Sequence, residues 1–197
     1  GRLYVAGITD VLVCLDSDSG KILWKKDFPN ETGSKKPDFG CASSPMILDD
    51  ALYMQAGGAL YKLNKTTGEV IWSALSDGGG MMGSAFASPT VAELNGVRQL
   101  LVQTRSHLNG LDLETGKVLW SQSVPSFRGM NILTPLVHDN NVFTSSYRNH
   151  SFMYSPVNKG GEWNVAEKWK VKKPAYMSTP VVKDGNVYMH LQNQRFT

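Results

Sequence analysis

The decapeptide LDLETGKVLW at residues 111–120 occurs in three closely similar copies in this chain of 197 residues. The other two are LDSDSGKILW at residues 15–24 and LNKTTGEVIW at residues 63–72. Each copy predicts two strands joined by a tight turn, because a polar segment ending in Gly separates two apolar runs. Gly supplies positive φ, and an Asp or Asn at the start of the turn can hydrogen-bond the turn backbone. These turn residues are Gly20, Gly68 and Gly116, with Asp16, Asn64 and Asp112 before them.

The copies belong to a longer repeat. The tryptophans Trp24, Trp72, Trp120 and Trp169 follow one another at intervals of 48, 48 and 49 residues. A second marker, Ser-Pro or Thr-Pro, recurs at intervals of 44, 46 and 45 residues, with its prolines at Pro45, Pro89, Pro135 and Pro180. A period of about 40–50 residues is typical of propeller blades or of helical arrays.

The local pattern favours strands over helices. Segments such as RQLLVQTR at 98–105 and NVFTSSYR at 141–148 are short and rich in β-branched and aromatic residues. Turn signals recur every 8–12 residues, which gives four strands per repeat. In the third repeat we expect strands at about 86–93, 98–105, 107–113 and 117–124. The predicted fold is an all-β propeller of four-stranded antiparallel blades.

The predicted domain covers residues 1–197 as a single propeller domain or part of one, with about four blades' worth of strands. The expected blade units are 1–28, 42–75, 85–124, 132–172 and 177–197. The first unit lacks the inner strand and the last has only the first two strands, so both ends contain the second strand of a blade. The two ends therefore duplicate each other, and unclosed blades leave apolar faces uncovered. We expect a second copy of the chain to cover them.

Composition excludes several classes of protein. The formal charge of +3 comes from 20 basic and 17 acidic residues, which does not suggest a nucleic-acid binder. No apolar run approaches the length of a membrane span, and the chain does not open on a charged and then apolar leader.

The two cysteines, Cys14 and Cys41, form no CxxC pair. They could pair with each other, or both could be buried thiols.

The repeated phrase resembles the tryptophan-docking motif A-x-D-x-x-T-G-K-x-x-W of pyrroloquinoline-quinone-type β-propellers. Three repeats match well, although Cys14, Lys62 and Gly110 stand at the alanine position and Glu69 replaces one lysine. The fourth copy, GGEWNVAEKW at 160–169, is degenerate, with a turn enlarged around its two glycines. The resemblance implies a ring of seven or eight blades and a structural role for the motif residues. It places Trp24, Trp72, Trp120 and Trp169 between neighbouring blades.

The same resemblance leaves the function open, because the docking motif belongs to the scaffold. The family includes quinone- and calcium-dependent dehydrogenases and non-catalytic members that act in outer-membrane barrel assembly. The chain has no GxSxG, HxH or HExxH motif and few acids in the loops, so we predict no catalytic residues and no metal site. We expect an exported, periplasmic or secreted binding and scaffolding module without a cofactor. The alternatives are a fragment of such a dehydrogenase, with quinone and calcium, and a carbohydrate binder using Trp163, Tyr147 and Tyr176.

The candidate site lies in the loops. In a four-stranded blade, the connection from the second to the third strand and the connection to the next blade share one face, where binding residues concentrate. Basic side chains from several blades fall there, and they could attract a protein partner or an anionic small ligand. The alternative interpretation is that these basic side chains are ordinary solvated surface residues. The candidate residues are Arg105, His107, Arg128, Arg148, His150 and Arg195, with Lys35, Lys36, Lys172 and Lys173 near the same rim.

Overall fold

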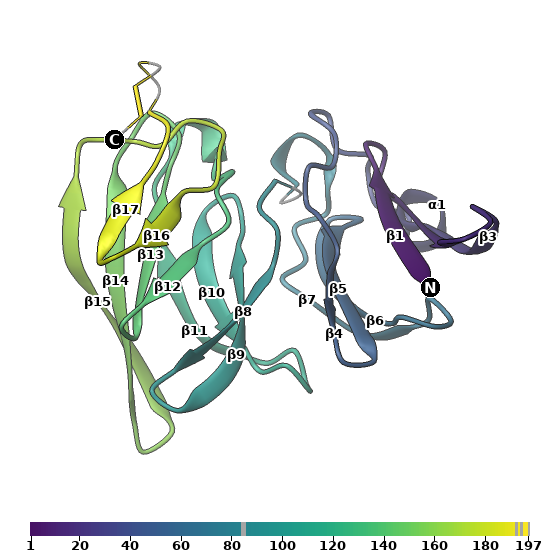
Figure 1. The fold of residues 1–197 in the computed structure, drawn as a ribbon, viewed down its shortest axis with the longest axis horizontal. Helices are drawn as coiled ribbons and strands as arrows, with labels where there is room; N and C mark the ends of the chain where they lie inside the picture. Colours follow the sequence, from purple (N-terminus) through teal and green to yellow (C-terminus); the bar gives the residue numbers. More distant parts are fainter. Residues whose placement is uncertain (84–85, 192, 194, 197) are drawn as a thin grey trace. The chain divides into compact units, whose positions relative to one another are not determined.

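The computed structural model describes residues 1–83, 86–191, 193 and 195–196, which form five antiparallel sheets (Figure 1). The chain divides into two compact units, Gly1–Pro89 (unit 1) and Thr90–Thr197 (unit 2). The structure confirms the predicted all-β fold of four-stranded blades, which is that of a partial propeller. No helix among the described residues has the length and apolar character needed to cross a membrane.

Unit 1 contains two sheets. The first has three strands in the order β1-β2-β3, and the second has four in the order β4-β5-β6-β7. The strands are β1 (Arg2–Gly7), β2 (Val11–Asp16), β3 (Ile22–Asp27), β4 (Met46–Leu48), β5 (Ala51–Ala56), β6 (Ala59–Asn64) and β7 (Val70–Ala74). Two short helices lie in the connections, α1 (Phe28–Thr32) and the 3₁₀ turn η1 (Gly80–Met82).

Unit 2 contains two four-stranded sheets and a two-stranded one. The first is β8 (Thr90–Leu94), β9 (Val97–Gln103), β10 (His107–Leu111) and β11 (Val118–Ser123). The second is β12 (Leu136–His138), β13 (Asn141–Ser145), β14 (Ser151–Lys159) and β15 (Glu162–Val171). The third is β16 (Val181–Lys183) and β17 (Asn186–Tyr188), and the 3₁₀ turn η2 (Phe127–Gly129) precedes β12.

The repeated turn has the same hydrogen bonds in all three copies. The side-chain oxygen Oδ1 of Asp16 accepts from the amide of Ser19 at 2.8 Å, and that of Asp112 accepts from the amide of Thr115 at 2.7 Å. In the middle copy, Asn64 Oδ1 accepts from the amide of Thr67 at 3.1 Å. The glycines Gly20, Gly68 and Gly116 have φ of 69°, 77° and 72°. The repeated decapeptide therefore forms the same turn in each copy, as its residue types predict.

Each motif tryptophan stands opposite a residue at a β-bulge. The pairs are Cys14 with Trp24, Lys62 with Trp72, Gly110 with Trp120 and Met153 with Trp169. In the first three hairpins the register shifts just after this pair and the turn follows. In the fourth, pairing continues as far as Lys159 and Glu162. The enlarged turn is therefore an extension of β14 and β15.

Two of these tryptophans contact the following blade of their own unit. The indole Nε1 of Trp24 donates to the carbonyl of Lys65 at 3.3 Å, and a Cβ on Gly68 would come within 2.8 Å of the same ring. Trp120 is 4% exposed and belongs to a cluster with Val142 and Phe152 of the next sheet. The partly buried Trp163 packs against that cluster.

The sequence analysis did not anticipate α1. Its signals are present in the chain, since Pro29 lies in the first turn and the Asp27 side chain accepts from the amide of Asn30. Gly33, with φ of 72°, ends the helix. Of the two alternatives for the cysteines, pairing is wrong: Cys14 is a buried free thiol and Cys41 a partly buried one.

Candidate binding site on the loop face of unit 2

The connections that follow β9, β11, β13, β15 and β17 lie at the same end of their antiparallel sheets, and we call them the loop face of unit 2. Their described residues are 104–106, 124–135, 146–150, 172–180, 189–191, 193 and 195–196. All six sequence-predicted site residues belong to unit 2. Arg105, Arg128, Arg148, His150 and Arg195 lie within these segments, and His107 adjoins the first.

The acidic residues of unit 2 are absent from one end of its sheets. The loop face has six Lys and Arg residues and no Asp or Glu. The seven acids of unit 2 lie elsewhere: six at or beside the turns at the opposite end and one, Glu167, within β15. A surface with one sign of charge raises the local concentration of ligands of the other sign. This arrangement favours an anionic partner at the loop face.

The structure brings two of the predicted arginines together over one aromatic ring. The guanidinium carbons of Arg128 and Arg148 each lie 5.2 Å from the centroid of Phe127. Arg148 also lies 5.4 Å from the ring of Tyr147, which is 6.4 Å from that of Phe127. Both arginines are exposed, and 41% of Phe127 is exposed. These four residues form what we call the arginine–aromatic cluster.

Backbone hydrogen bonds hold the two halves of the cluster to each other. The amide of Phe127 donates to the carbonyl of Tyr147 at 3.2 Å, and the amide of Tyr147 donates to the carbonyl of Met130 at 3.2 Å. The side-chain amide of Asn149 donates to the carbonyl of Pro125 at 2.7 Å. These hydrogen bonds join the loop after β11 to the loop after β13.

Arg105 lies beneath the cluster and has a different surrounding. It is buried, and its Nη2 donates to the carbonyl of Arg128 at 2.7 Å. The side chain of the buried Asn131 donates to the carbonyls of Arg105 at 3.1 Å and Val124 at 2.9 Å. Arg105 thus supports the loop that presents Arg128. The sequence gave no sign of its burial.

The aromatic row continues into the loop after β15. The ring of Tyr176 lies 6.1 Å from that of Tyr147 and 6.2 Å from that of His190. The amide of Tyr176 donates to the carbonyl of His190 at 2.8 Å, and the amide of Ala175 donates to the Ser145 hydroxyl at 2.7 Å. Tyr176 is 38% exposed and therefore offers a ring to a partner. The sequence analysis considered Tyr176 only as a possible sugar-binding residue.

The other predicted residues lie around the cluster and make local contacts. The ring nitrogen Nδ1 of His107 lies 2.8 Å from the Ser106 hydroxyl, and that of His150 lies 2.5 Å from Asn149 Oδ1. Arg195 is exposed, and its carbonyl accepts from the amide of Leu191 at 2.8 Å.

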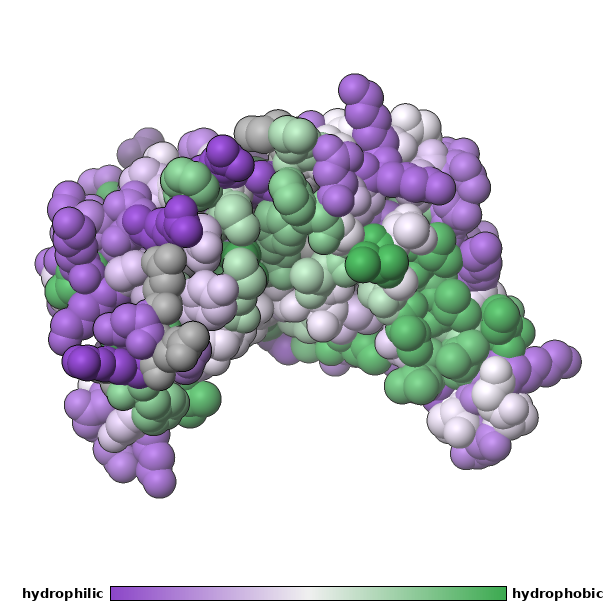
Figure 2. Space-filling view, turned by 90° about the horizontal axis from the view of Figure 1, so that it is seen from above, coloured by the Kyte–Doolittle hydropathy of each residue, from purple (hydrophilic) through white to green (hydrophobic). Residues whose placement is uncertain are grey.

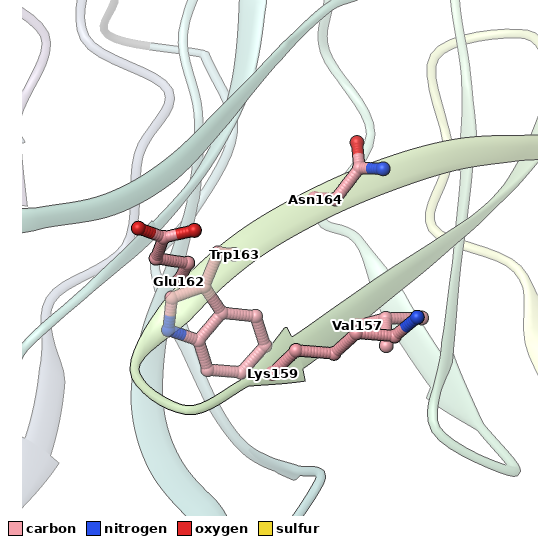
Figure 3. A pocket seen from close by; sticks show the side chains of 5 residues that line it. All are labelled: Val157, Lys159, Glu162, Trp163 and Asn164. Carbon is pink, nitrogen blue, oxygen red and sulfur yellow. The ribbon is translucent and has the colours of Figure 1, made fainter.

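A separate pocket of about 280 Å³ lies along the extended β14–β15 hairpin (Figure 3). Trp163 is at its centre, with Lys159 and Glu162 beside it. Its lining comes from this one hairpin, whose turn is at the end of the sheet opposite to the loop face. The three residues considered for sugar binding therefore do not form one site, because Tyr147 and Tyr176 lie on the loop face.

The carboxylates near the loops of unit 1 do not fit a calcium site. Glu31 Oε2 is ion-paired with Lys26 Nζ at 2.6 Å, and Asp77 Oδ1 accepts from the amide of Gly79 at 2.9 Å. Asp10 is buried and its Oδ2 accepts from the amide of Gly57 at 2.8 Å. In the part of the chain that the structure describes, no three His, Cys, Asp or Glu side chains gather where they could hold a metal ion.

The repeated hairpin, the bulge opposite each tryptophan and the four-stranded sheets define a β-propeller built from pyrroloquinoline-quinone-like repeats. A family model described as outer membrane protein assembly factor BamB matches residues 1–197. The chain belongs to this family.

Solved structures agree with this fold. BamB from Moraxella catarrhalis superposes with a TM-score of 0.64 at 15% identity, over 98% of this chain and 65% of that one. A quinohemoprotein alcohol dehydrogenase from Pseudomonas putida HK5 gives a TM-score of 0.60 at 14% identity, over 98% of this chain and 38% of that one. At these identities the likeness concerns the fold alone.

A curated relative, tetrathionate hydrolase of Acidithiobacillus ferrooxidans, is 26% identical over 131 residues. The match covers 62% of this chain and 26% of the hydrolase. The chain thus spans about a quarter of that relative and less than two thirds of either propeller structure.

Proposed function

We propose that the protein is a non-catalytic binding and scaffolding module whose loop face in unit 2 binds an acidic region of a protein partner. The observation that carries this proposal is the absence of acids from the loop face, which has six Lys and Arg residues. Membership of a family described as an outer membrane protein assembly factor supports a protein partner over a substrate. The same description supports a periplasmic or secreted location, and the function requires no cofactor.

The chemistry of the loop face suits a protein partner better than a small anion. The arginine–aromatic cluster is a surface feature built from two loops, and Tyr176 extends it into a third. Arg and Tyr are the residues that contribute most binding energy at protein interfaces, because each combines a large contact area with hydrogen-bonding groups. Loops that are ordered before binding also lose less conformational entropy on binding.

We also propose that a second copy covers the outer face of the β1–β2–β3 sheet in unit 1. The side chains of Leu3 and Val5 on β1 are exposed, whereas Tyr4 and Ala6 between them pack against the core. Figure 2 shows apolar residues gathered on the unit that carries β1 and β3 in Figure 1. This face has the alternation of a blade face that another blade covers. Light scattering at tens of micromolar should give the mass of a dimer, and a monomer would refute this.

Site-specific photo-crosslinking tests the proposed function. A photoreactive residue would replace Lys172 on the loop face or, as the control, Glu114 in the turn at the opposite end, both of which are exposed. We expect export into the periplasm of a Gram-negative host to give one discrete protein adduct from position 172 and none from position 114. Mass spectrometry should place the cross-link in an acidic segment of the partner. Equal adducts from both positions, or none from position 172, would refute a partner at the loop face.

A further inference from the structure

The backbone of the arginine–aromatic cluster is unusual. Arg128 and Arg148 have positive φ angles of 54° and 58°. Positive φ is uncommon in residues other than Gly, Asn and Asp, and it is found preferentially where structure serves function. Among the described non-glycine residues with positive φ, six are Asp or Asn and the remaining three are Leu75, Arg128 and Arg148. Two of these three residues, Arg128 and Arg148, lie over the ring of Phe127.

Both guanidinium groups lie beside an aromatic ring, and both arginine side chains are exposed. Stacking on Phe127 and Tyr147 orders the two side chains without using their hydrogen-bond donors. An ordered guanidinium has lost its rotamer entropy in advance and can bind a carboxylate through two parallel hydrogen bonds.

The rings provide a second kind of contact next to the charges. Phe127, Tyr147, Tyr176 and His190 follow one another with centroid separations of 6.1–6.4 Å. Met177, beside Tyr176, is 48% exposed. The loop face therefore offers a row of aromatic rings that begins where the two guanidinium groups lie. A ligand that uses both must have carboxylates and an apolar or aromatic group close together along its length.

We propose that the arginine–aromatic cluster binds an extended peptide segment of a partner protein in which an aromatic residue is flanked by Asp or Glu. The carboxylates pair with Arg128 and Arg148, and the aromatic side chain lies on Tyr147 and Tyr176. This deepens the proposed function and rests on it, because it names the segment and the side chains that recognise it. A peptide is favoured over a nucleic acid because the six Lys and Arg residues of the loop face are spread over five loops, with Arg105 buried, and unit 1 has an acidic excess, with ten acids against eight bases.

Calorimetric titration of the full 197-residue chain tests this inference. The probe is the capped peptide Glu-Glu-Tyr-Glu-Glu, compared with the same peptide in which Gln replaces Glu. The key variant is Arg128→Asn with Arg148→Asn, because Asn tolerates positive φ and removes the charge without straining the loops. The control, Lys117→Gln with Lys183→Gln, removes the same charge from exposed positions at the opposite end of the sheets.

We expect the double Asn variant to bind the peptide at least tenfold more weakly than the natural chain, with an unchanged melting temperature. Tyr176→Ser should also weaken binding, the Gln peptide should bind at least tenfold more weakly, and the Lys control should change affinity less than twofold. An equal loss in the Lys control would mean that only net charge matters. An oligonucleotide of equal charge that binds as tightly would mean a general polyanion site. Either result, or no binding of the Glu peptide, would overturn this inference and would leave standing the proposed function, which the cross-linking experiment tests separately.

Discussion

At the scale of single residues, the structure separates charges that are exposed for binding from charges buried inside the fold. Asp10 belongs to the second kind: it is 1% exposed and lies in the loop between β1 and β2. Burial raises the pKa of its carboxyl, and the hydrogen bond from the amide of Gly57 lowers it by less. The nearby Cys41 thiol is also affected, since burial and then the charge of Asp10 raise its pKa to about 12.

Asp10 should make stability depend on pH. Because its pKa is higher in the folded than in the unfolded chain, the folded state keeps a proton that the unfolded state has lost. Its contribution to the free energy of unfolding is then largest below the unfolded pKa and falls as the pH rises through the folded pKa. We predict that Asp10→Asn unfolds at higher urea than the natural chain at pH 8 and at the same urea at pH 3.5. If the difference in unfolding urea concentration between the variant and the natural chain were equal at both pH values, the raised pKa of Asp10 would be contradicted.

A second residue-scale prediction concerns the motif tryptophans. Trp120 is 4% exposed and its Nε1 donates to Gln99 Oε1 at 2.6 Å, whereas Trp169 is 37% exposed. Trp120→Ala should lower the free energy of unfolding by about 3–5 kcal/mol, as expected for a buried aromatic ring. Trp169→Ala is the control and should cost clearly less. Equal losses in urea denaturation would show that burial does not distinguish the two positions.

At the scale of elements, the repeated hairpin shows how one turn serves two purposes. Gly20 and Gly68 occupy the same turn position with similar φ angles of 69° and 77°. A Cβ on Gly20 would meet nothing within 4 Å, but a Cβ on Gly68 would lie 2.8 Å from the Trp24 ring. Gly20 is therefore required by the turn alone, and Gly68 by the turn and by the contact with the preceding blade.

The two glycines allow a matched experiment. Gly20→Ala should cost about 1–2 kcal/mol of stability, the penalty for a left-handed non-glycine residue. Gly68→Ala should cost more, because Trp24 must also move. Chemical denaturation followed by tryptophan fluorescence measures both. If Gly20→Ala were as costly as Gly68→Ala, the contact between the blades would add nothing to stability.

Among these elements, the sequence could predict the blades but not the arginine–aromatic cluster. The blades follow from local chemistry, because Asp16, Asn64 and Asp112 with their glycines specify the turn wherever they occur. The arginine–aromatic cluster depends on something else, namely that the loop after β11 bonds to the loop after β13. Such a meeting of distant loops has no local signature, so the sequence predicted the face but neither the pairing of the arginines nor the burial of Arg105. Helix α1 was missed for a different reason: its five residues are too few to show a helical period.

At the scale of the whole molecule, the basic excess belongs to one half of the chain. Residues 1–89 have eight basic and ten acidic residues, whereas residues 90–197 have twelve basic and seven acidic ones. Within unit 2, the turns that repeat from blade to blade are at one end of the sheets and the acid-free loops are at the other. The repeated end maintains the fold, and the other end is the one that we propose binds a partner.

The most direct test of binding at the loop face is a series of ¹H–¹⁵N correlation spectra of the full chain during titration with the Glu-Glu-Tyr-Glu-Glu peptide. Our account predicts that the shifted amide signals belong to residues 125–130, 146–150 and 172–177. Signals from the turns at 112–117, 139–140 and 184–185 should stay in place. Shifts concentrated in those turns or in residues 1–89, with the loops unchanged, would contradict the assignment of the loop face of unit 2 as the binding site.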